Sequence, residues 1–381
     1  MWRESRSGSA QDCRRIRATG RLPRCRCRAC GVMTEEGAVN RDTSTFKPFA
    51  VGLLLLAPLC VYGLLRTPFT TAEQLLLARA QGGIGELSGS LYSPLYLLLL
   101  KLWSGVSLHP SWLRLLSALC GLAALPLAQR VVRGLGGSHA TQGALLLLGG
   151  APLMVLLASR LSPGTAGLVA TLGCFACFLE LGRDGDWRWL VGWLVTALVA
   201  CGMHAGLFWI VVVQWAVVLL YRERYRVRQL PWWLIQLLPV AWLGWRYYPL
   251  LEEYLGVRLS RGLSGLQMAD GAALAVRLST GLALPFGLVG TLLLTALLCV
   301  GLWAARDWRR DPRHGLLLLC LVVPGVCWLL LWRDDAHLAM PLLCWCTLVA
   351  MGLRQFPRWG RQMLWSFVAL VYLWSYWRLL G

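Results

Sequence analysis

Long apolar runs alternate with short polar segments along this chain, from residue 47 to its C-terminal end. About eleven of the runs approach the length that an α-helix needs to cross about 30 Å of hydrocarbon. They cover residues 47–65, 112–132, 140–159, 163–182, 187–204, 205–221, 231–248, 282–305, 314–332, 337–353 and 362–379. The pattern therefore predicts an all-α, polytopic integral membrane protein with about eleven transmembrane helices.

The polar segments between the runs differ in arginine content, and this difference predicts the orientation of the chain. Cytoplasmic loops of membrane proteins carry an excess of Lys and Arg. One alternation of sides places all the arginine clusters in the cytoplasm together with the basic N-terminus, namely those at 130–133, 183–188, 222–228, 306–313 and 354–361. The C-terminus then lies outside, together with the segments 66–111, 160–162, 249–281 and 333–336.

One apolar stretch, residues 91–103, is not expected to cross the membrane. It has only 13 residues, is interrupted by Ser93 and Pro94, and carries Lys101. A stretch of this length suits a re-entrant or interfacial helix better than a span. Counting it as a crossing would also move the later arginine clusters outside. The sequence therefore predicts that residues 66–111 form one external loop, which contains a helix beside the membrane.

The composition agrees with a membrane protein and explains the large positive charge. Hydrophobic residues make up 57% of the chain and charged residues 14%, and the mean hydropathy is +0.58, values far from those of a soluble domain. The net charge of +19 comes mainly from the N-terminal tail and from loops beside the apolar runs. The excess of Lys and Arg that cytoplasmic loops carry accounts for most of that charge. We therefore expect membrane lipids as partners and no nucleic acid.

Residues 1–46 differ from the rest of the chain, because they are polar, rich in arginine and without apolar periodicity. We expect this tail to be disordered, and the membrane domain to be 47–381. The four cysteines at positions 13–30 include a single CxxC spacing and have no nearby His, so a zinc site is not predicted. Met33 begins a more ordinary leader, which makes residues 1–32 a candidate upstream extension of the reading frame.

The external loop 66–111 contains the most informative carboxylate of the chain, Glu73. The sequence around it predicts a helix with Thr70 or Thr71 as its N-cap. Glu73 would stand in the first turn, where an acid suits the positive end of the helix dipole. Its structural interpretation is therefore that of a capping acid.

The order of several motifs suggests a second interpretation. The first apolar run and the acid-bearing loop are followed by SPLYLLLLKLW (93–103), WLRLLSALCGL (112–122) and the turn ASRLSPGTAGL (158–168). Over residues 47–221 this order resembles the polyprenyl-phosphate-sugar-dependent glycosyltransferases of the membrane GT-C class. The resemblance is greatest to the dolichyl-phosphate-mannose-protein mannosyltransferase-like and aminoarabinose-transferase-like group. It predicts a GT-C type fold.

The resemblance implies an inverting sugar transfer on the non-cytoplasmic face. The donor would be a polyprenyl-phosphate sugar, and the acceptor a lipid, a glycan or a protein. An acid in the first external loop acts in such enzymes as general base on the acceptor hydroxyl, and basic residues bind the departing phosphate. The family's Asp-Glu pair falls on Ala72 and Glu73, so alanine occupies the Asp position. Either Glu73 is the catalytic base or transfer activity has been lost.

The chain departs from the family at two further places. A His-Pro-Pro-like segment is replaced by Tyr92-Ser93-Pro94, and the acid that often precedes the second-loop arginine is replaced around Ala158 and Ser159.

Three basic residues on the predicted external side are candidates for binding the donor phosphate: Arg160, Arg114 and Lys101. Each also has a structural alternative. Lys101 can extend its ammonium to the interface, and the two arginines can anchor helix ends to lipid headgroups. The short turn after Arg160 gives this arginine no other evident role, which favours phosphate contact there.

Two histidines complete the candidate substrate-binding residues. His204 lies near the external end of its apolar run, where related enzymes often carry a histidine or an aromatic residue. His337 follows a polar cluster at 333–335. The alternative for His204 is a histidine hydrogen-bonded inside a helix bundle. The alternative for His337 is a surface cluster whose opposite charges neutralise each other. The loop 249–281 is expected to form a lid or an acceptor-side wall, or else a solvated loop.

Three function classes therefore remain open for a protein expected in a bacterial inner membrane. The leading prediction is a glycosyltransferase that uses a polyprenyl-phosphate donor. The second is a non-catalytic relative that binds the lipid-linked substrate or scaffolds a partner, which Ala72 supports. The third, a transporter or flippase, is disfavoured because paired intramembrane charges and matched interrupted repeats are not evident. No Asp-rich metal motif is present in the sequence, so neither a metal nor another cofactor is predicted.

Overall fold

The computed structural model describes most of the predicted membrane domain. The described residues are 46–66, 69–83, 94–184, 186–221, 268–280, 288–309, 311–330 and 335–380, with short pieces between 232 and 244. Several predictions fall outside these residues: the N-terminal tail, the arginine cluster 222–228, most of the loop 249–281, and residues 333–334.

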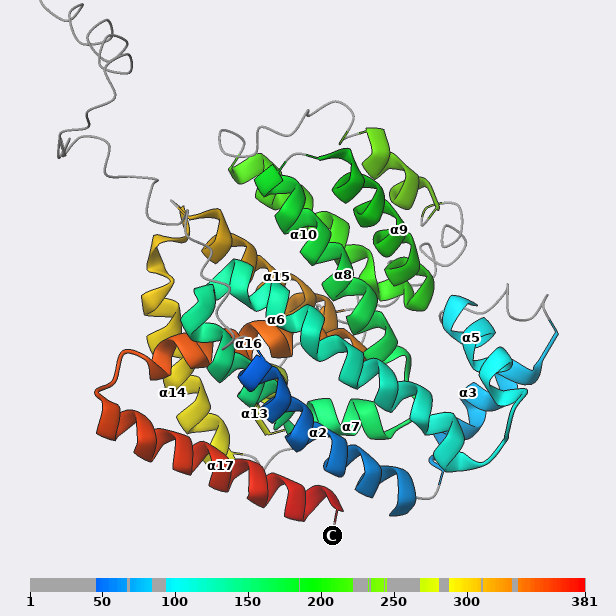
Figure 1. Ribbon diagram of the computed structural model, residues 1–381, viewed down its shortest axis with the longest axis horizontal. Coiled ribbons are helices and arrows are strands. Elements are labelled where there is room, and N and C mark those ends of the chain that lie inside the picture. The colour runs from blue at the N-terminus through cyan, green and yellow to red at the C-terminus, as the bar shows by residue number, and fades with distance from the viewer. Residues whose placement is uncertain are drawn as a thin grey trace, which may run out of the picture. The chain divides into compact units, whose positions relative to one another are not determined.

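All regular structure within the described ranges is helical, as predicted (Figure 1). The α-helices are α2 (Phe46–Arg66), α3 (Thr71–Gln81), α5 (Pro94–Ser104), α6 (Pro110–Gly149), α7 (Pro152–Ser159), α8 (Pro163–Asp184), α9 (Trp187–Met203), α10 (Trp209–Leu220), α13 (Met268–Thr280), α14 (Leu288–Ala304), α15 (Pro312–Leu330), α16 (Ala339–Leu353) and α17 (Arg358–Leu380). The described residues also form 3-10 helices at Ala205–Phe208 (η3), Arg306–Arg309 (η5) and Asp335–Leu338 (η6).

Some of these helices are candidate membrane spans by length and composition. Three of the described helices qualify, at Pro110–Ser138, Pro163–Arg183 and Pro312–Leu329. A fourth candidate is a helix pair bent by 52°, formed by Ala140–Gly149 and Pro152–Ser159. Shorter apolar helices occupy several of the other predicted runs. The candidate spans agree with an integral membrane protein, whereas the count of eleven crossings and their direction remain predictions.

The chain between residues 112 and 159 shows how predicted and observed boundaries differ. The sequence predicts two passes with a polar loop between them, and α6 consists of two helices that meet at a kink at Gly137, within that polar segment. The φ angle of Gly137 is 77°, a left-handed value that glycine adopts without steric cost. The second pass is then divided between the end of α6 and α7, which begins at Pro152, where a missing N–H costs no helical hydrogen bond.

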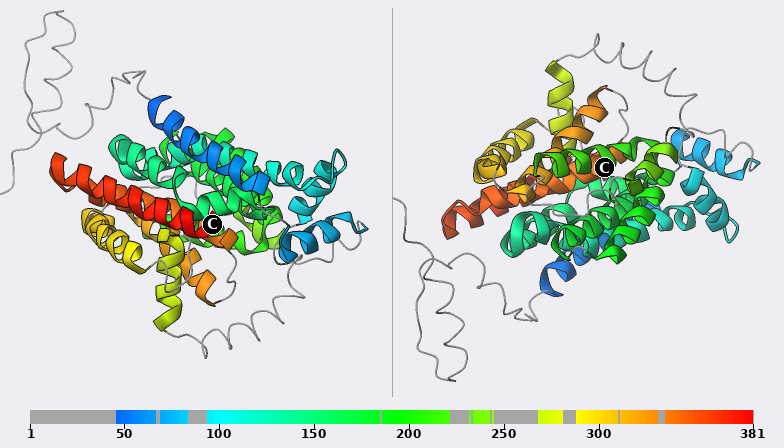
Figure 2. Two further views of the ribbon diagram at one scale, coloured as in Figure 1. Left: turned by 90° about the horizontal axis from the view of Figure 1, so that it is seen from below. Right: turned by 90° about the horizontal axis from the view of Figure 1, so that it is seen from above.

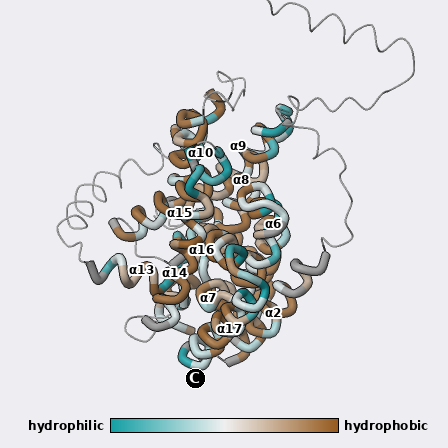
Figure 3. The backbone as a smooth tube through the Cα atoms, turned by 90° about the vertical axis from the view of Figure 1, so that its left-hand side faces the viewer, coloured by the Kyte–Doolittle hydropathy of each residue, from teal (hydrophilic) through white to brown (hydrophobic). Residues whose placement is uncertain are grey.

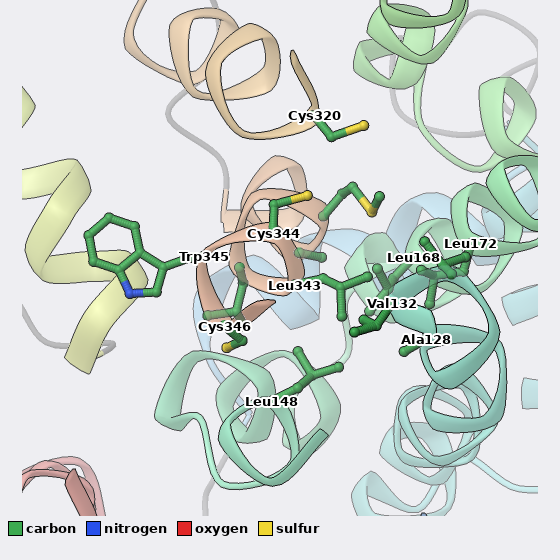
Figure 4. Packing of buried hydrophobic residues seen from close by; sticks show 14 of the residues in the cluster. Ala128, Val132, Leu148, Leu168, Leu172, Cys320, Leu343, Cys344, Trp345 and Cys346 are labelled. Carbon is green, nitrogen blue, oxygen red and sulfur yellow. The ribbon is translucent and has the colours of Figure 1, made fainter. Parts of the chain in front are cut away.

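Helix α16 lies at the centre of the described helices. It is apolar on every side, and its residues from Ala339 to Ala350 are buried. The close-up in Figure 4 shows α16 side chains pointing in several directions toward neighbouring helices. The labelled residues are Leu343, Cys344, Trp345 and Cys346 of α16, Cys320 of α15, Leu168 and Leu172 of α8, and Ala128, Val132 and Leu148 of α6.

Two glycines allow α14 and α16 to approach each other closely. A Cβ atom on Gly301 would overlap the carbonyl oxygen of Leu348, and one on Gly352 would overlap that of Leu297. Small residues at such crossings are typical of helix pairs in membranes, where close backbone approach replaces the hydrophobic effect as the source of attraction.

The outer surface of the helices is also apolar. Figure 3 shows hydrophobic residues along most of the helical backbone. Helix α17, red in Figure 2, runs beside α14, and exposed large residues cover much of its length. They include Trp359, Met363, Phe367, Leu370, Leu373 and Trp377. An exposed apolar surface of this kind is expected where lipid, and not water, surrounds a protein.

Helices α3 and α5 pack together beside the start of α6 and form a second, smaller core (Figure 1). Its buried members are Ala80, Tyr96, Leu97, Leu100, Leu113, Leu116, Leu161 and Ala166. Trp103 and Trp112 close the α5–α6 connection, because their rings stack at 4.7 Å and each indole N–H donates to the other residue's carbonyl oxygen. The predicted short helix at 91–103 is therefore confirmed as α5, whose 11 residues are too few for a span.

Candidate functional site

The carboxylate of Glu73 caps the N-terminus of α3. The side chain of Thr70 accepts a hydrogen bond from the backbone N–H of Glu73, and the Glu73 carboxylate accepts one from the backbone N–H of Thr70 at 2.9 Å. This reciprocal arrangement is a capping box, and it satisfies two N–H groups that the helix itself cannot pair. The structural interpretation of Glu73 as a capping acid, with Thr70 as the N-cap, is therefore confirmed.

The same carboxylate forms a buried ion pair with Arg114 of α6. Arg114 donates from Nε to Oε1 and from Nη2 to Oε2 of Glu73, both at 2.8 Å. Both side chains are buried, because Arg114 is 0% exposed and Glu73 2% exposed. Two parallel N–H···O bonds of this kind fix the orientation of the carboxylate as well as its position. The guanidinium also lies over the ring of Phe69, 5.2 Å from its centre.

A third element meets this carboxylate. The backbone N–H of Leu161, in the turn between α7 and α8, donates to Oε1 of Glu73 at 2.8 Å. With the hydroxyl of Thr70 at 3.1 Å from Oε2, the carboxylate accepts five hydrogen bonds from described residues. A carboxylate offers about four lone-pair positions. We call the group formed by Thr70, Glu73, Arg114 and the Leu161 N–H the Glu73 joint.

Burial and hydrogen bonding act in opposite directions on Glu73. Burial raises the pKa of the carboxyl, but the bonds from Arg114, Leu161 and Thr70 and the charge of Arg114 together lower the pKa below its usual value. Glu73 is therefore a carboxylate at neutral pH and a weaker base than an ordinary glutamate. Because the pKa is lowered in the folded state, this contribution to stability is present above the ordinary glutamate pKa. It is lost as the pH falls through the lowered value.

The two other cations of the predicted set have more accessible positions. Arg160 ends α7 in an extended conformation, and its side chain is exposed. Among the residues that the structure describes, it has no ion-pair or hydrogen-bond partner. Lys101 of α5 is half-buried, and its ammonium donates to the carbonyl oxygen of Gly82, at the end of α3, at 2.9 Å. Arg160 thus directly precedes Leu161, whose N–H belongs to the Glu73 joint, whereas Lys101 connects α5 to α3.

The structure brings the two candidate histidines together. His204 ends α9 and His337 belongs to η6, and their rings meet edge to face with 4.4 Å between centres. Both are buried. His204 lies at the end of α9 that packs against α5, since Gly202 contacts Leu95. The pair therefore lies at the end of α9 that contacts α5, although the two histidines are 133 positions apart in the sequence.

Several features of the site were not anticipated from the sequence. The sequence offered Arg114 as a candidate for binding a phosphate or a lipid headgroup, and in the structure its guanidinium pairs with Glu73 inside the protein. The partners Glu73, Arg114 and Leu161 come from three separate segments, and no spacing pattern links them. Ala72, which the resemblance aligned with an aspartate, is exposed, one residue from the buried Glu73. No three His, Cys, Asp or Glu residues in the described part of the chain are arranged to hold a metal ion.

Comparison with known proteins identifies the fold. No protein-family model and no curated protein matches the sequence. Solved structures of two membrane glycosyltransferases of the GT-C class do match the fold. ArnT from Cupriavidus metallidurans bound to undecaprenyl phosphate matches with a TM-score of 0.58 at 14% identity, covering 86% of this chain and 63% of ArnT. AglB from Archaeoglobus fulgidus, in complex with an inhibitory peptide and a dolichol-phosphate, matches with a TM-score of 0.60 at 11% identity, covering 88% and 56%.

These matches confirm the GT-C-like fold that the sequence predicted. They also show a difference in size, because the chain spans 63% of the length of ArnT and 56% of that of AglB. At 11% to 14% identity the likeness establishes the arrangement of helices and leaves the chemistry to be argued from the site.

Proposed function

We propose that this chain binds a polyprenyl-phosphate-linked sugar at its non-cytoplasmic face and transfers the sugar to a lipid, glycan or protein acceptor. The observation that carries the proposal is the exposed guanidinium of Arg160, which stands on a turn bonded to a buried acid in a GT-C-like fold. Solved structures with this fold hold undecaprenyl phosphate in ArnT and a dolichol-phosphate in AglB. The chemistry common to these two ligands is a phosphate on a long polyprenyl chain.

The phosphate side of the proposed site consists of Arg160 and Lys101. Guanidinium binds phosphate oxygens through paired hydrogen bonds, and ammonium adds a compact positive charge. Glu73 and Arg114 neutralise each other, so the cations that remain give this part of the protein a positive charge suited to an anion. Arg114 contributes to the site only through its bonds to Glu73 in the Glu73 joint, because its guanidinium is fully buried. His204 and His337 are proposed to border the sugar or the acceptor on the side of α9.

If Glu73 is the general base, one of its carboxylate oxygens must be free to accept a proton. A base needs a free lone pair within hydrogen-bonding distance of the acceptor hydroxyl. Both carboxylate oxygens of Glu73 are occupied by donors, and the lowered pKa reduces their basicity. Transfer with Glu73 as base therefore requires the Arg114 ion pair to open when the substrates bind.

The same observation favours a second candidate function. If the ion pair stays closed and position 72 carries no carboxylate, the protein can bind a lipid-linked donor without catalysing transfer. Such a protein would present or sequester the donor, or scaffold a partner that acts on it. The two candidates share the phosphate site and differ only in whether a proton acceptor reaches the acceptor hydroxyl.

The test is a binding and transfer assay with the purified full-length protein in lipid nanodiscs. A radiolabelled undecaprenyl-phosphate-linked sugar is the donor, and Arg160→Ala is compared with Arg183→Ala, an exposed arginine of α8. We expect the wild type and Arg183→Ala to bind the donor, and Arg160→Ala to bind about tenfold more weakly, the loss of one charge-assisted contact. Labelled product with added acceptors supports the transferase, and binding without product supports the second candidate. A wild type that does not bind the donor contradicts both.

A further inference from the structure

We infer that Glu73 and Arg114 are a positioning pair that fixes the α7–α8 turn, so that Arg160 is held ready for the phosphate of the lipid-linked ligand. The inference rests on the proposed function, because it takes Arg160 as the residue that contacts the phosphate. It assigns Glu73 a task that involves no proton transfer, and this task serves the transferase and the binding protein equally.

The first support is the position of the Leu161 N–H. This group belongs to the peptide unit that joins Arg160 to Leu161, and it donates to Oε1 of Glu73 at 2.8 Å. Holding the plane of that peptide restricts the ψ angle of Arg160, which is 155°. The direction in which the Arg160 side chain leaves the end of α7 therefore depends in part on a buried carboxylate 87 positions earlier in the chain.

The second support is the number of elements that meet at the carboxylate. Thr70 and Glu73 bring the start of α3, Arg114 brings the first turns of α6, and Leu161 brings the turn. The bidentate bonds from Arg114 prevent the carboxylate from rotating about its own axis. Burying both charges costs desolvation energy, which offsets much of their attraction, so we assign this fully hydrogen-bonded pair a role in fixing one geometry.

A second contact holds the same turn against α6. Ser117 lies one helical turn after Arg114, and its hydroxyl donates to the carbonyl oxygen of Ser162 at 3.3 Å. In the reverse direction the N–H of Ser162 approaches the Ser117 oxygen at 3.4 Å. The side chain of Leu161 is buried in the small core with α3 and α5. The turn is thus held on the protein side at Leu161 and Ser162, whereas the Arg160 side chain is exposed.

The two arginines therefore have separate tasks. Arg114 is fully buried and cannot reach a ligand without breaking its bonds to Glu73. Arg160 is exposed, and a phosphate can reach it without any such rearrangement. Because Glu73 and Arg114 carry opposite charges, the positioning pair adds no net charge to the site. The attraction for a phosphate then comes from Arg160 and Lys101.

Replacing Glu73 by glutamine separates positioning from proton transfer. Glutamine keeps the size of the side chain, but its NH2 group replaces one carboxylate oxygen and cannot accept from Arg114, so the three bonds from Leu161 and Arg114 cannot all form. If Glu73 acts through Arg160, Glu73→Gln weakens phosphate binding in a protein that still has Arg160, and has no further effect once Arg160 has been removed. A residue that acts only as a base would change the rate of transfer and leave the binding of a sugar-free phosphate lipid unchanged.

The experiment is a double-mutant cycle on the binding of undecaprenyl phosphate, which carries no sugar, to the full-length protein in nanodiscs. The variants are Glu73→Gln, Arg160→Ala and the double variant. Glu180→Gln, the same change at an exposed acid of α8, is the control. We expect Arg160→Ala to raise Kd about tenfold, Glu73→Gln to raise it at least threefold, and the double variant to match Arg160→Ala. A Glu73→Gln protein that binds like the control, or effects that multiply in the double variant, would overturn the inference.

A ligand-free readout separates this inference from the proposed function. Hydrogen–deuterium exchange of peptides covering residues 159–163 reports whether Glu73 protects the turn. We expect faster exchange there in Glu73→Ala than in the wild type, with unchanged exchange in α16. If the wild type fails to bind undecaprenyl phosphate, the proposed function is contradicted, and the exchange data still decide whether Glu73 holds the turn. Equal exchange in Glu73→Ala and the wild type would refute the positioning role even if the lipid binds.

Discussion

Replacement of Arg114 by methionine is expected to destabilise the protein by about 3–5 kcal/mol, the range for breaking a buried pair by removing one partner. The change leaves the Glu73 carboxylate buried without its counter-charge, although methionine fills a similar volume. Thermal unfolding in detergent measures the loss. The control is Arg183→Met, because Arg183 is 75% exposed and stands 3.9 Å from Glu180, a surface pair that contributes little.

Two further measurements show whether the unpaired charge causes the loss. The double variant Arg114→Met with Glu73→Gln should recover part of the stability, because a neutral amide needs no counter-charge. The difference in stability between the wild type and Arg114→Met should become smaller as the pH falls. In the wild type the lowered pKa of Glu73 makes acid destabilising, whereas in the variant burial favours the protonated acid. A loss in Arg114→Met no larger than that in Arg183→Met would contradict the account of the Glu73 joint.

Introduction of a carboxylate at position 72 is expected to increase sugar transfer about 10²-fold, the lower end of the range for a positioned general base. Ala72 is exposed in the first turn of α3, where an acid also suits the helix dipole. An aspartate there would carry free lone pairs, unlike Glu73, and it stands at the position where the resembled family carries its acid. The rate of transfer from undecaprenyl-phosphate-linked sugar, measured at saturating donor, gives the result.

The matched control for Ala72→Asp is Thr71→Asp. Thr71 is also exposed, lies in the same helical turn, and would receive the same charge. Because neighbouring positions of a helix point in directions about 100° apart, only one of the two carboxylates can face the acceptor. A gain in Ala72→Asp alone supports the proposed site. An equal gain in both variants, or none in either while the donor binds, would contradict the placement of the acceptor beside α3.

The positions of the helices could be predicted from the sequence because they depend on local patterns. Apolar runs of sufficient length specify the helices, and the short run interrupted by Pro94 was recognised as the separate helix α5. The capping role of Glu73 also followed from local sequence, since Thr70 stands three positions before it. The local pattern did not reveal that the two helices of α6 meet directly at a kink, which is possible because Gly137 tolerates a φ angle that other residues avoid.

The Glu73 joint could not be predicted, because its bonds depend on tertiary packing. Glu73 and Arg114 are 41 positions apart, and Glu73 and Leu161 are 88 apart. A charged residue near the end of an apolar run indicates a headgroup anchor as readily as a buried partner, so Arg114 carried no signal of its own. The Leu161 contact involves a backbone N–H, which every residue except proline has. The His204–His337 contact likewise joins distant segments.

The central claim is that the turn carrying Arg160 faces the non-cytoplasmic side, where lipid-linked sugars would meet it. Labelling with a membrane-impermeant thiol reagent tests this claim directly, with Arg160→Cys compared with Arg183→Cys and with the unchanged parent protein. We expect Arg160→Cys to react above the parent level in intact spheroplasts, and Arg183→Cys to react only after permeabilisation. Reaction of Arg160→Cys only after permeabilisation would contradict the account.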